Sequence, residues 1–300
     1  MEKYYNEISL FSRLLNFGFK FTNSKKNSIS VDAAKKYIDK LSKKSNYTIP
    51  DRLGLTLENY KDMKVYTYNG SLKDKRKKLL YIHGGSYIEE AISFQIKFAM
   101  KIAKKTNSTL IFPVYPLAPN SNYKIMYKLM TNLYETITNT TKNINFLGDS
   151  AGGGFVLSFA MYLRDNKMLM PQNIVMLSPW VDVSMENPDL YILEKHDYMC
   201  GVDGTRYEGE LWADGLDLKN YLISPLYGNF NDLGKMTIIT GSREILNSDC
   251  HILSNKLKKK KIDHNFIEYM GQGHDFGAYP TKEGNMVIND IATIINGGVI

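Results

Sequence analysis

One serine lies between two glycines at the end of an apolar run, in the segment INFLGDSAGG at residues 144–153. The apolar residues predict a buried strand, and a helix is predicted to begin at about Gly152. A residue in such a sharp strand-to-helix turn needs glycine neighbours, because a Cβ on either side would collide with the strand or the helix. The Ser150 hydroxyl would then point out of the turn, so Ser150 is a candidate nucleophile. A purely structural turn is the alternative.

A pair of glycines follows another apolar run, in the segment His83-Gly84-Gly85-Ser86. Without side chains in the way, Gly84 and Gly85 can turn their backbone N–H groups toward an oxyanion, together with the N–H of Ala151. Ala151 is expected at a helix N-terminus, where partial positive charge stabilises an anionic oxygen. We predict these three amides as an oxyanion hole and a structural role for His83; a simple glycine turn is the alternative.

A nucleophilic serine needs a histidine to accept its proton and a carboxylate to orient that histidine. Of the five histidines, His274 is the predicted base, because it lies in the glycine-flanked loop GQGHDFG (271–277) after the last predicted strand. His264 and His251 are expected to be exposed or structural. His196 lies in a long insertion, where a contact with substrate is conceivable.

Two carboxylates follow the preceding strand, in the segment TGSREILNSD at residues 240–249. Glu244 lies in the loop itself and is the preferred acid, whereas Asp249 is expected on the next helix, where the helix dipole favours an early carboxylate. The order Ser150, Glu244, His274 along the chain is that of α/β-hydrolases and differs from the other serine-triad folds.

The composition narrows the class of protein. The 300 residues are 43% hydrophobic and 12% aromatic, which is enough for a large core and argues against disorder. The formal net charge of +7 comes mostly from lysine, whereas proteins that read nucleic acids favour arginine, so no nucleic-acid partner is expected. The lysine-rich runs at 73–78 and 256–261 are expected to be solvated, with weak attraction to anionic surfaces as the alternative.

Cofactors and targeting segments are not indicated either. Cys200 and Cys250 show neither metal-ligand spacing nor a dense disulfide framework, and the proposed chemistry calls for no metal and no cofactor. The N-terminal residues do not resemble a signal peptide, and no apolar stretch approaches the roughly 18 residues that span a bilayer. We therefore expect a cytoplasmic protein without stable membrane insertion.

From about residue 63 onward, short apolar runs alternate with helical patterns. The predicted strands are 63–69, 77–84, 108–115, 144–148, 173–178, 235–240 and 264–270, with helices near 90–105, 123–141, 152–166, 205–219, 248–261 and 283–296. Because continuous apolar strands are buried on both faces, the pattern predicts an α/β fold with a doubly wound, mostly parallel sheet.

The chain is expected to form a single domain over residues 1–300 with a helical cap. The stretch between residues 178 and 235 is too long for an ordinary loop and predicts an insertion with its own short helix. We expect the cap to comprise approximately residues 1–50 and 180–222, folded over the sheet edge where the other loops gather; a decorated surface loop is the alternative.

Several of these segments together resemble the hormone-sensitive-lipase-like α/β-hydrolases. HGGSY (83–87) is similar to their HGGG loop, YPLAPN (115–120) to their Y-R-L-A-P-E segment, and GDSAGG (148–153) is their nucleophile motif unaltered. LSPWVDVS (177–184) and GHDF (273–276) extend the resemblance, which runs from about residue 75 to 280.

The resemblance implies an α/β-hydrolase fold and a carboxylester hydrolase that uses Ser150, an acid and His274. It also implies an oxyanion hole from the amides of Gly84, Gly85 and Ala151, and an acyl-binding cap built partly from the N-terminus.

The chain departs from the family pattern in two places near the site. Ser86 replaces the third glycine of the loop, and Glu244-Ile245-Leu246 stands where Asp-Pro-Leu is usual. The expected function is hydrolysis of small-molecule esters with short-to-medium acyl chains through a Ser-Glu-His triad. An amidase or deacetylase of the same fold and a non-catalytic relative that binds a small ligand are the alternatives, and a homodimer is left open.

Overall fold

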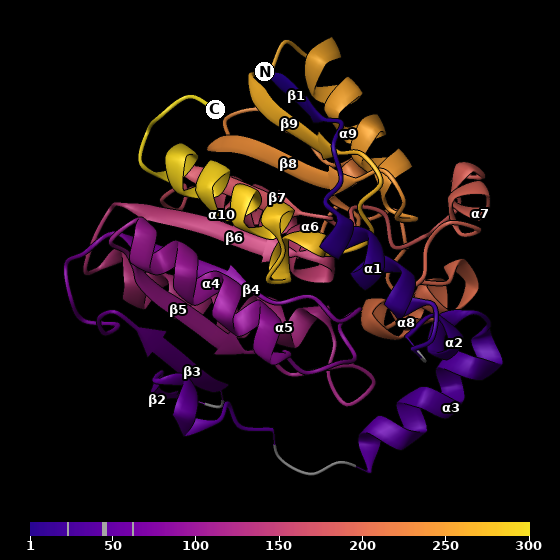
Figure 1. The fold of residues 1–300 in the computed structure, drawn as a ribbon. Helices are drawn as coiled ribbons and strands as arrows, with labels where there is room; N and C mark the ends of the chain where they lie inside the picture. The colour runs from indigo at the N-terminus through magenta and orange to yellow at the C-terminus, as the bar shows by residue number, and fades with distance from the viewer. Residues whose placement is uncertain (23, 44–46, 62) are drawn as a thin grey trace.

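The computed structural model describes residues 1–22, 24–43, 47–61 and 63–300. Its centre is a nine-stranded sheet with the strand order β1-β9-β8-β7-β6-β4-β5-β3-β2 (Figure 1). The strands are β1 (Glu2–Tyr5), β2 (Thr56–Tyr60), β3 (Met63–Tyr68), β4 (Lys78–Ile82), β5 (Thr109–Val114), β6 (Ile144–Asp149), β7 (Asn173–Leu177), β8 (Lys235–Gly241) and β9 (His264–Tyr269). Strand β3 pairs antiparallel with both β2 and β5, and all the other pairs are parallel.

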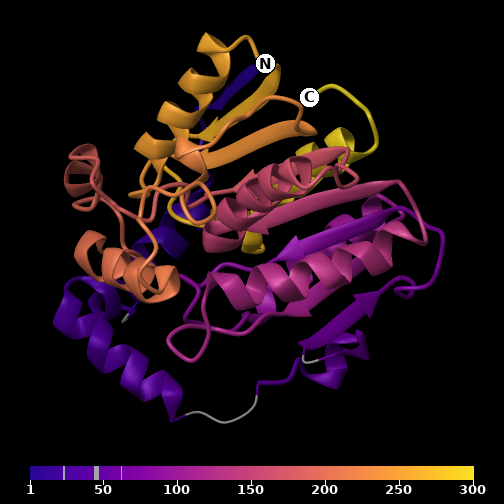
Figure 2. The ribbon, with the colours of Figure 1, turned by 180° about the vertical axis from the view of Figure 1, so that it is seen from behind.

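Helices cover both faces of this sheet. They are α1 (Leu10–Phe19), α2 (Ser24–Ser28), α3 (Val31–Ser42), α4 (Ser93–Lys105), α5 (Tyr123–Thr138), α6 (Ser150–Asp165), α7 (Asp189–Leu193), α8 (Val202–Ala213), α9 (Asn247–Lys259) and α10 (Lys282–Ile295). Helices α4 and α10 lie on the face seen in Figure 1, and α5, α6 and α9 on the opposite face, seen in Figure 2. Every residue of β4, β6 and β7 is buried, as expected for strands covered on both sides. The predicted doubly wound, mostly parallel sheet is confirmed.

The parallel strands bring the predicted site segments to one edge. Strands β4, β6, β8 and β9 run in the same direction, so their carboxyl ends meet at the same edge of the sheet. The glycine loop, the serine turn, the loop that holds Glu244 and the loop that holds His274 each leave one of these ends. In doubly wound sheets this edge is where ligands bind.

The N-terminal segment and the insertion pack together beside this edge. Helices α2 and α3 contact α8 of the insertion. The backbone N–H of Gly201 donates to Ser28 Oγ at 2.9 Å, and Lys25 Nζ donates to the backbone carbonyls of Glu194 and Asp197. The insertion holds two helices, α7 and α8, where one was expected. The first residues differ too, because β1 pairs with β9 in the central sheet instead of folding over it.

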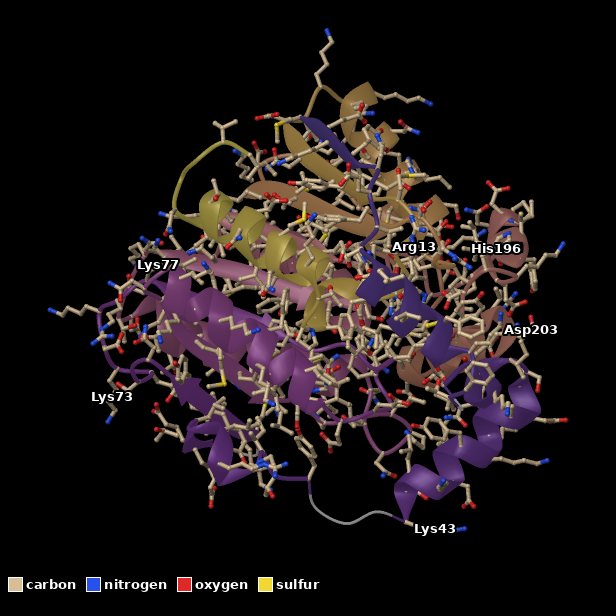
Figure 3. All side chains as sticks on the ribbon, in the orientation of Figure 1. Arg13, Lys43, Lys73, Lys77, His196 and Asp203 are labelled. Carbon is tan, nitrogen blue, oxygen red and sulfur yellow. The ribbon has the colours of Figure 1, made fainter. Side chains whose placement is uncertain are left out.

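The lysine run at 73–78 is exposed at Lys73, Lys75 and Arg76, half-buried at Asp74 and Lys77, and buried at Lys78. Lys73 projects from the surface (Figure 3), whereas the side chain of Lys78 is fully buried. Lys78 Nζ lies 2.6 Å from Asp74 Oδ1 and 2.7 Å from the carbonyl oxygen of Ser71, so this lysine joins the loop to β4. The expectation of a wholly solvated run is therefore wrong at Lys78.

Within the described ranges, no helix is long and apolar enough to cross a bilayer.

Candidate active site

Ser150 occupies a strained turn at the first position of α6. Its φ of 52° lies in the left-handed region, which residues other than glycine adopt uncommonly. The glycines on either side are required sterically: a Cβ at Gly148 would lie 2.3 Å from the carbonyl oxygen of Gly152, and a Cβ at Gly152 would lie 2.1 Å from that of Ile82. The sequence pattern predicted such collisions, and the turn presents the Ser150 hydroxyl toward the loop after β9.

The structure brings Ser150, His274 and Glu244 together in one hydrogen-bonded chain. Ser150 Oγ lies 2.9 Å from His274 Nε2, and His274 Nδ1 lies 2.5 Å from Glu244 Oε2. All three residues are buried. With Glu244 accepting from Nδ1, the Nε2 atom is the one free to accept the serine proton, as a general base requires.

Glu244 is itself held in position by the end of β8. Its other carboxylate oxygen, Oε1, accepts from the Thr240 hydroxyl at 2.6 Å and from the Gly241 backbone N–H at 2.8 Å. The second candidate acid, Asp249, lies in the first turn of α9 and accepts from Asn187 Nδ2 at 2.7 Å. Burial raises the pKa of Asp249 to about 6. The geometry therefore joins Glu244, and not Asp249, to His274.

Several carboxyl groups surround His274. Burial alone would disfavour its protonated form, but the nearby carboxylates of Asp275, Glu244 and Asp197 outweigh it and raise the pKa of His274 to about 10. Asp275 Oδ2 lies 3.4 Å from the same Nε2 atom that faces Ser150. An imidazolium formed during the reaction is thus stabilised on both sides of the ring.

Sequence reasoning missed the role of two aspartates that adjoin the triad. Asp149 precedes Ser150, and it accepts from the Tyr81 hydroxyl and, at 2.6 Å, from Gln95 Nε2. Burial raises the pKa of Asp275 well above its usual value, although the His274 charge opposes this, and the carboxylates of Asp149 and Glu244 raise it further. Both aspartates flank predicted residues in the quoted segments, but spacing alone did not indicate that β6 and the His274 loop bring them close.

The glycine loop after β4 packs directly against the serine. A Cβ at Gly84 would lie 2.7 Å from Ser150 Cβ, so only glycine permits this approach. His83 is fully buried, and its ring stacks on that of Tyr115 with centroids 4.3 Å apart. Burial lowers the pKa of His83, which favours a neutral ring. These contacts fit the structural role predicted for His83.

Tyr87 connects the glycine loop to both α6 and α8. Its hydroxyl donates to the carbonyl oxygen of Ala151 at 2.8 Å, and its ring stacks on Trp212 of α8 with centroids 4.3 Å apart. Ala151 is the second residue of α6, so its N–H has no partner within the helix. Gly84 and Ala151 thus lie next to Ser150, and the amides of Gly84, Gly85 and Ala151 remain the predicted oxyanion hole.

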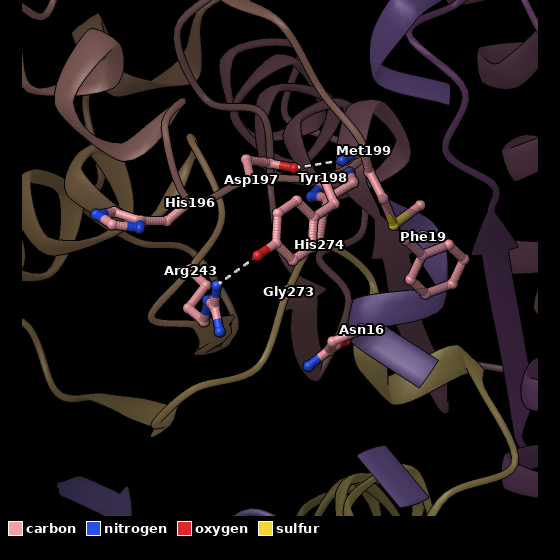
Figure 4. Close-up of a pocket in the computed structure, with 9 residues that line it drawn as sticks. All are labelled: Asn16, Phe19, His196, Asp197, Tyr198, Met199, Arg243, Gly273 and His274. Carbon is pink, nitrogen blue, oxygen red and sulfur yellow. Dashed lines mark hydrogen bonds between the residues drawn. The ribbon is translucent and has the colours of Figure 1, made fainter. Parts of the chain in front are cut away.

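A small pocket reaches His274 between α1 and the insertion (Figure 4). Its empty volume is about 240 Å³, part of it open to solvent, and its walls include Asn16 and Phe19 of α1 and Tyr198 and Met199 of the insertion. Arg243 and Tyr198 both line the pocket, and Arg243 Nη2 donates to the Tyr198 hydroxyl at 3.1 Å. His196 also lines the pocket, so the one insertion histidine for which substrate contact was considered lies close to the site.

Comparisons with known proteins agree with this fold and site. The family model of the α/β-hydrolase fold matches residues 79–278, and the chain belongs to this family. An esterase from Acinetobacter venetianus is 24% identical over 220 residues, covering 71% of this chain and 73% of that protein. An acetyl-hydrolase from Streptomyces hygroscopicus is 24% identical over 199 residues, covering 65% and 67% of the two chains.

The fold is also that of a solved hormone-sensitive lipase from a metagenome library. Its crystal structure superimposes with a TM-score of 0.78 over 97% of this chain and 99% of that one, at 24% identity. The predicted resemblance to the hormone-sensitive-lipase-like α/β-hydrolases is therefore confirmed.

Proposed function

We propose that this chain is a serine carboxylester hydrolase of the carboxylesterase type. The observation that carries the proposal is the hydrogen-bonded chain from Ser150 Oγ through both nitrogens of His274 to Glu244. The relatives named esterase and acetyl-hydrolase support the same activity. Such a chain of groups serves to activate a serine toward an acyl carbon.

In the proposed first half-reaction, Ser150 Oγ attacks the ester carbonyl carbon as His274 Nε2 takes the hydroxyl proton. Glu244 holds the imidazole in the tautomer that accepts at Nε2 and stabilises the imidazolium. The carbonyl oxygen becomes an oxyanion, to which the amides of Gly84, Gly85 and Ala151 donate. Each such donor is worth about 3 kcal/mol of transition-state stabilisation. The tetrahedral intermediate then collapses, and the alcohol leaves with the proton from His274.

The second half-reaction repeats these steps with water. His274 accepts a proton from water as the water oxygen attacks the acyl-enzyme, and the proton returns to Ser150 Oγ when the carboxylic acid leaves. The proposed steps use only side chains and amides of this chain.

The pocket supports a preference for short-to-medium acyl chains. The side chains of Phe19 and Met199 line the space next to His274. The acetyl-hydrolase relative is named for a short acyl group. A cytoplasmic location and the formation of a homodimer stay predictions.

Hydrolysis of p-nitrophenyl butyrate by the wild type, Ser150→Ala and His274→Ala tests the proposal. We expect the wild type to turn over and both variants to lose a factor of about 10⁴ or more in kcat, as in other serine-triad enzymes. Parallel assays with p-nitroacetanilide distinguish an amidase, which would cleave the anilide at a comparable rate. Equal turnover by the wild type and Ser150→Ala would contradict the proposal.

A further inference from the structure

Helix α1 carries an apolar stripe on the side that faces solvent. Leu10, Leu14, Phe17 and Phe21 are 73%, 60%, 53% and 72% exposed. Their spacing of three and four residues places them on one side of the helix and its C-terminal turn. The rings of Phe17 and Phe21 lie against each other, with centroids 5.2 Å apart. The usual orientation of a surface helix, apolar side inward, is reversed here.

Polar contacts on the inner side of α1 fix this orientation. Ser12 is buried, and its hydroxyl donates to Glu283 Oε2 at 2.6 Å. Asn16 Nδ2 donates to the carbonyl oxygen of Gly271, in the loop that holds His274, at 3.2 Å. Rotation of the helix to bury the apolar stripe would break these bonds and take a donor away from the buried Glu283 carboxylate, which is costly. The stripe therefore stays outward.

Cations flank the stripe. Arg13 and Lys20 are exposed and lie seven residues apart, so both project from the same side of the stripe. Figure 3 shows Arg13 on α1. Residues 10–21 contain no acidic side chain. An apolar stripe bordered by basic residues is the pattern of helices that lie in the surface of an anionic membrane.

The same helix also forms a wall of the candidate active site. Asn16 and Phe19, on its inner side, line the pocket that reaches His274 (Figure 4). A surface that contacts the outer side of α1 would therefore lie next to the pocket. The stripe thus adjoins the candidate active site, whereas other exposed apolar residues, such as Leu57 on β2, do not line the pocket.

We propose that the apolar stripe of α1, with Arg13 and Lys20, docks the protein on anionic lipid surfaces. Docking leaves the pocket beside the lipid surface, so the substrates would be amphiphilic esters that lie in that surface. This second part of the proposal rests on the proposed hydrolase function. A second copy of the chain is a poorer occupant. In a twofold dimer through this face, the cations of both copies would meet at the same interface and repel.

Sedimentation with lipid vesicles tests the docking. The protein is the full chain with Ser150→Ala, so that hydrolysis plays no part, and the vesicles are phosphatidylcholine alone or with 30% phosphatidylglycerol. Because each basic residue near an anionic surface contributes a factor of about five in affinity, we expect binding about tenfold or more tighter to the anionic vesicles. Added salt should weaken that preference.

Two double variants separate the contributions of the stripe. L14Q/F17Q should lose about tenfold or more of the binding to both vesicle types, because it removes apolar contact. R13Q/K20Q should lose mainly the preference for phosphatidylglycerol. L57Q/I252Q, which also replaces two exposed apolar residues but on β2 and α9, should bind like the parent. Circular dichroism checks that each variant is folded.

The results that would overturn the proposal are specific. They are absent binding by the parent, undiminished binding by L14Q/F17Q, or an equal loss in L57Q/I252Q. Analytical ultracentrifugation showing a dimer that only L14Q/F17Q dissociates, together with absent vesicle binding, would assign the stripe to self-association instead.

The substrate part has its own readout in chains that retain Ser150. L14Q/F17Q should slow hydrolysis of p-nitrophenyl octanoate held in anionic vesicles at least about fivefold, with hydrolysis of dissolved p-nitrophenyl acetate kept within about twofold. Equal rates on vesicle-held ester would overturn this part. If the hydrolase function fails instead, both rates vanish while vesicle binding remains, so the two failures are distinguishable.

Discussion

Glu244 is the acid of the proposed triad because the loop after β8 places its carboxylate against His274. Glu244 lies three residues beyond the last residue of β8, Gly241, whose own N–H fixes one of its carboxylate oxygens. The longer glutamate side chain leaves its other oxygen 2.5 Å from His274 Nδ1. Asp249 lies about one helical turn later, and its carboxylate accepts a hydrogen bond from Asn187 of the insertion. Spacing in the sequence favoured Glu244 but could not show these contacts.

We predict opposite outcomes for the two acids. Glu244→Gln should lower kcat/KM for p-nitrophenyl butyrate by about 10³ to 10⁴, because the amide can hold the imidazole in the wrong tautomer. Asp249→Asn keeps the size of the side chain and should change kcat/KM by less than about threefold. The reverse ranking, measured on proteins of equal thermal stability, would move the acid to Asp249.

The carboxyl groups around His274 should shape the pH dependence. The base form of His274 is active, and its pKa is raised above the ordinary 6.5, so kcat/KM should rise with pH along a limb that lies above 6.5. Asp275→Asn removes one of the carboxylates that favour the imidazolium and should move that limb toward lower pH.

The exposed Asp232→Asn serves as the matched control for this measurement. In this variant, kcat/KM should rise over the same pH range as in the wild type. A limb at or below 6.5 in the wild type, or one that Asp275→Asn leaves unmoved, would contradict the assigned role of Asp275.

At the level of elements, the central strands were predictable and the N-terminal segment was less so. The runs that became β4 to β8 are mostly apolar, because both faces of these strands are covered, so their pattern is plain. Strand β1, with the sequence EKYY, is short, partly charged and at the sheet edge, where one side remains exposed. The apolar residues of α1 have helical spacing, but hydrogen bonds of Ser12 and Asn16 hold the opposite side of the helix inward, and the sequence pattern does not reveal these contacts.

Helix α8 of the insertion contains a buried acid next to the glycine loop. Burial raises the pKa of Glu208 to about 8, and the charge of Glu89 adds to this, although a hydrogen bond from Ser86 opposes it. In the unfolded chain this carboxyl loses its proton near pH 4.5. The folded state therefore binds more protons between pH 4.5 and 8, and its stability falls as the pH rises through that range.

We predict that Glu208→Gln flattens this decline. The difference in free energy of unfolding between Glu208→Gln and the wild type should increase from pH 5 to pH 8. Its slope should be at most about 1.4 kcal/mol per pH unit. Urea unfolding at four pH values measures it, and Glu210→Gln, an exposed acid on the same helix, is the control. Parallel pH profiles for the wild type and Glu208→Gln would show that Glu208 is ionised in the folded protein.

For the whole molecule, one edge of the sheet organises both the chemistry and the access to it. The loops after β4, β6, β8 and β9 supply the glycine loop, nucleophile, acid and base, and α1 and residues 196–199 of the insertion line the pocket next to His274. The resemblance in the sequence indicated this arrangement. It did not indicate which side chains narrow the pocket, because that depends on how α1 packs beside residues 196–199.

This packing predicts how acyl length can be altered. Phe19→Ala should enlarge the pocket and raise the ratio of kcat/KM for p-nitrophenyl octanoate to that for the acetate several-fold, because a longer acyl chain gains apolar contact. Phe11→Ala, which removes an exposed ring from the same helix, should leave the ratio unchanged. An unaltered ratio in Phe19→Ala would mean that the acyl chain lies elsewhere.

The most direct test of the central claim is the covalent labelling of the nucleophile. A fluorophosphonate reacts with a serine that a neighbouring base activates, and mass spectrometry of the labelled protein identifies the residue. We expect one adduct per chain, located on Ser150, with labelling abolished in Ser150→Ala and strongly slowed in His274→Ala. An adduct on another serine, or labelling of Ser150→Ala at the wild-type rate, would contradict the assignment of Ser150 as the nucleophile.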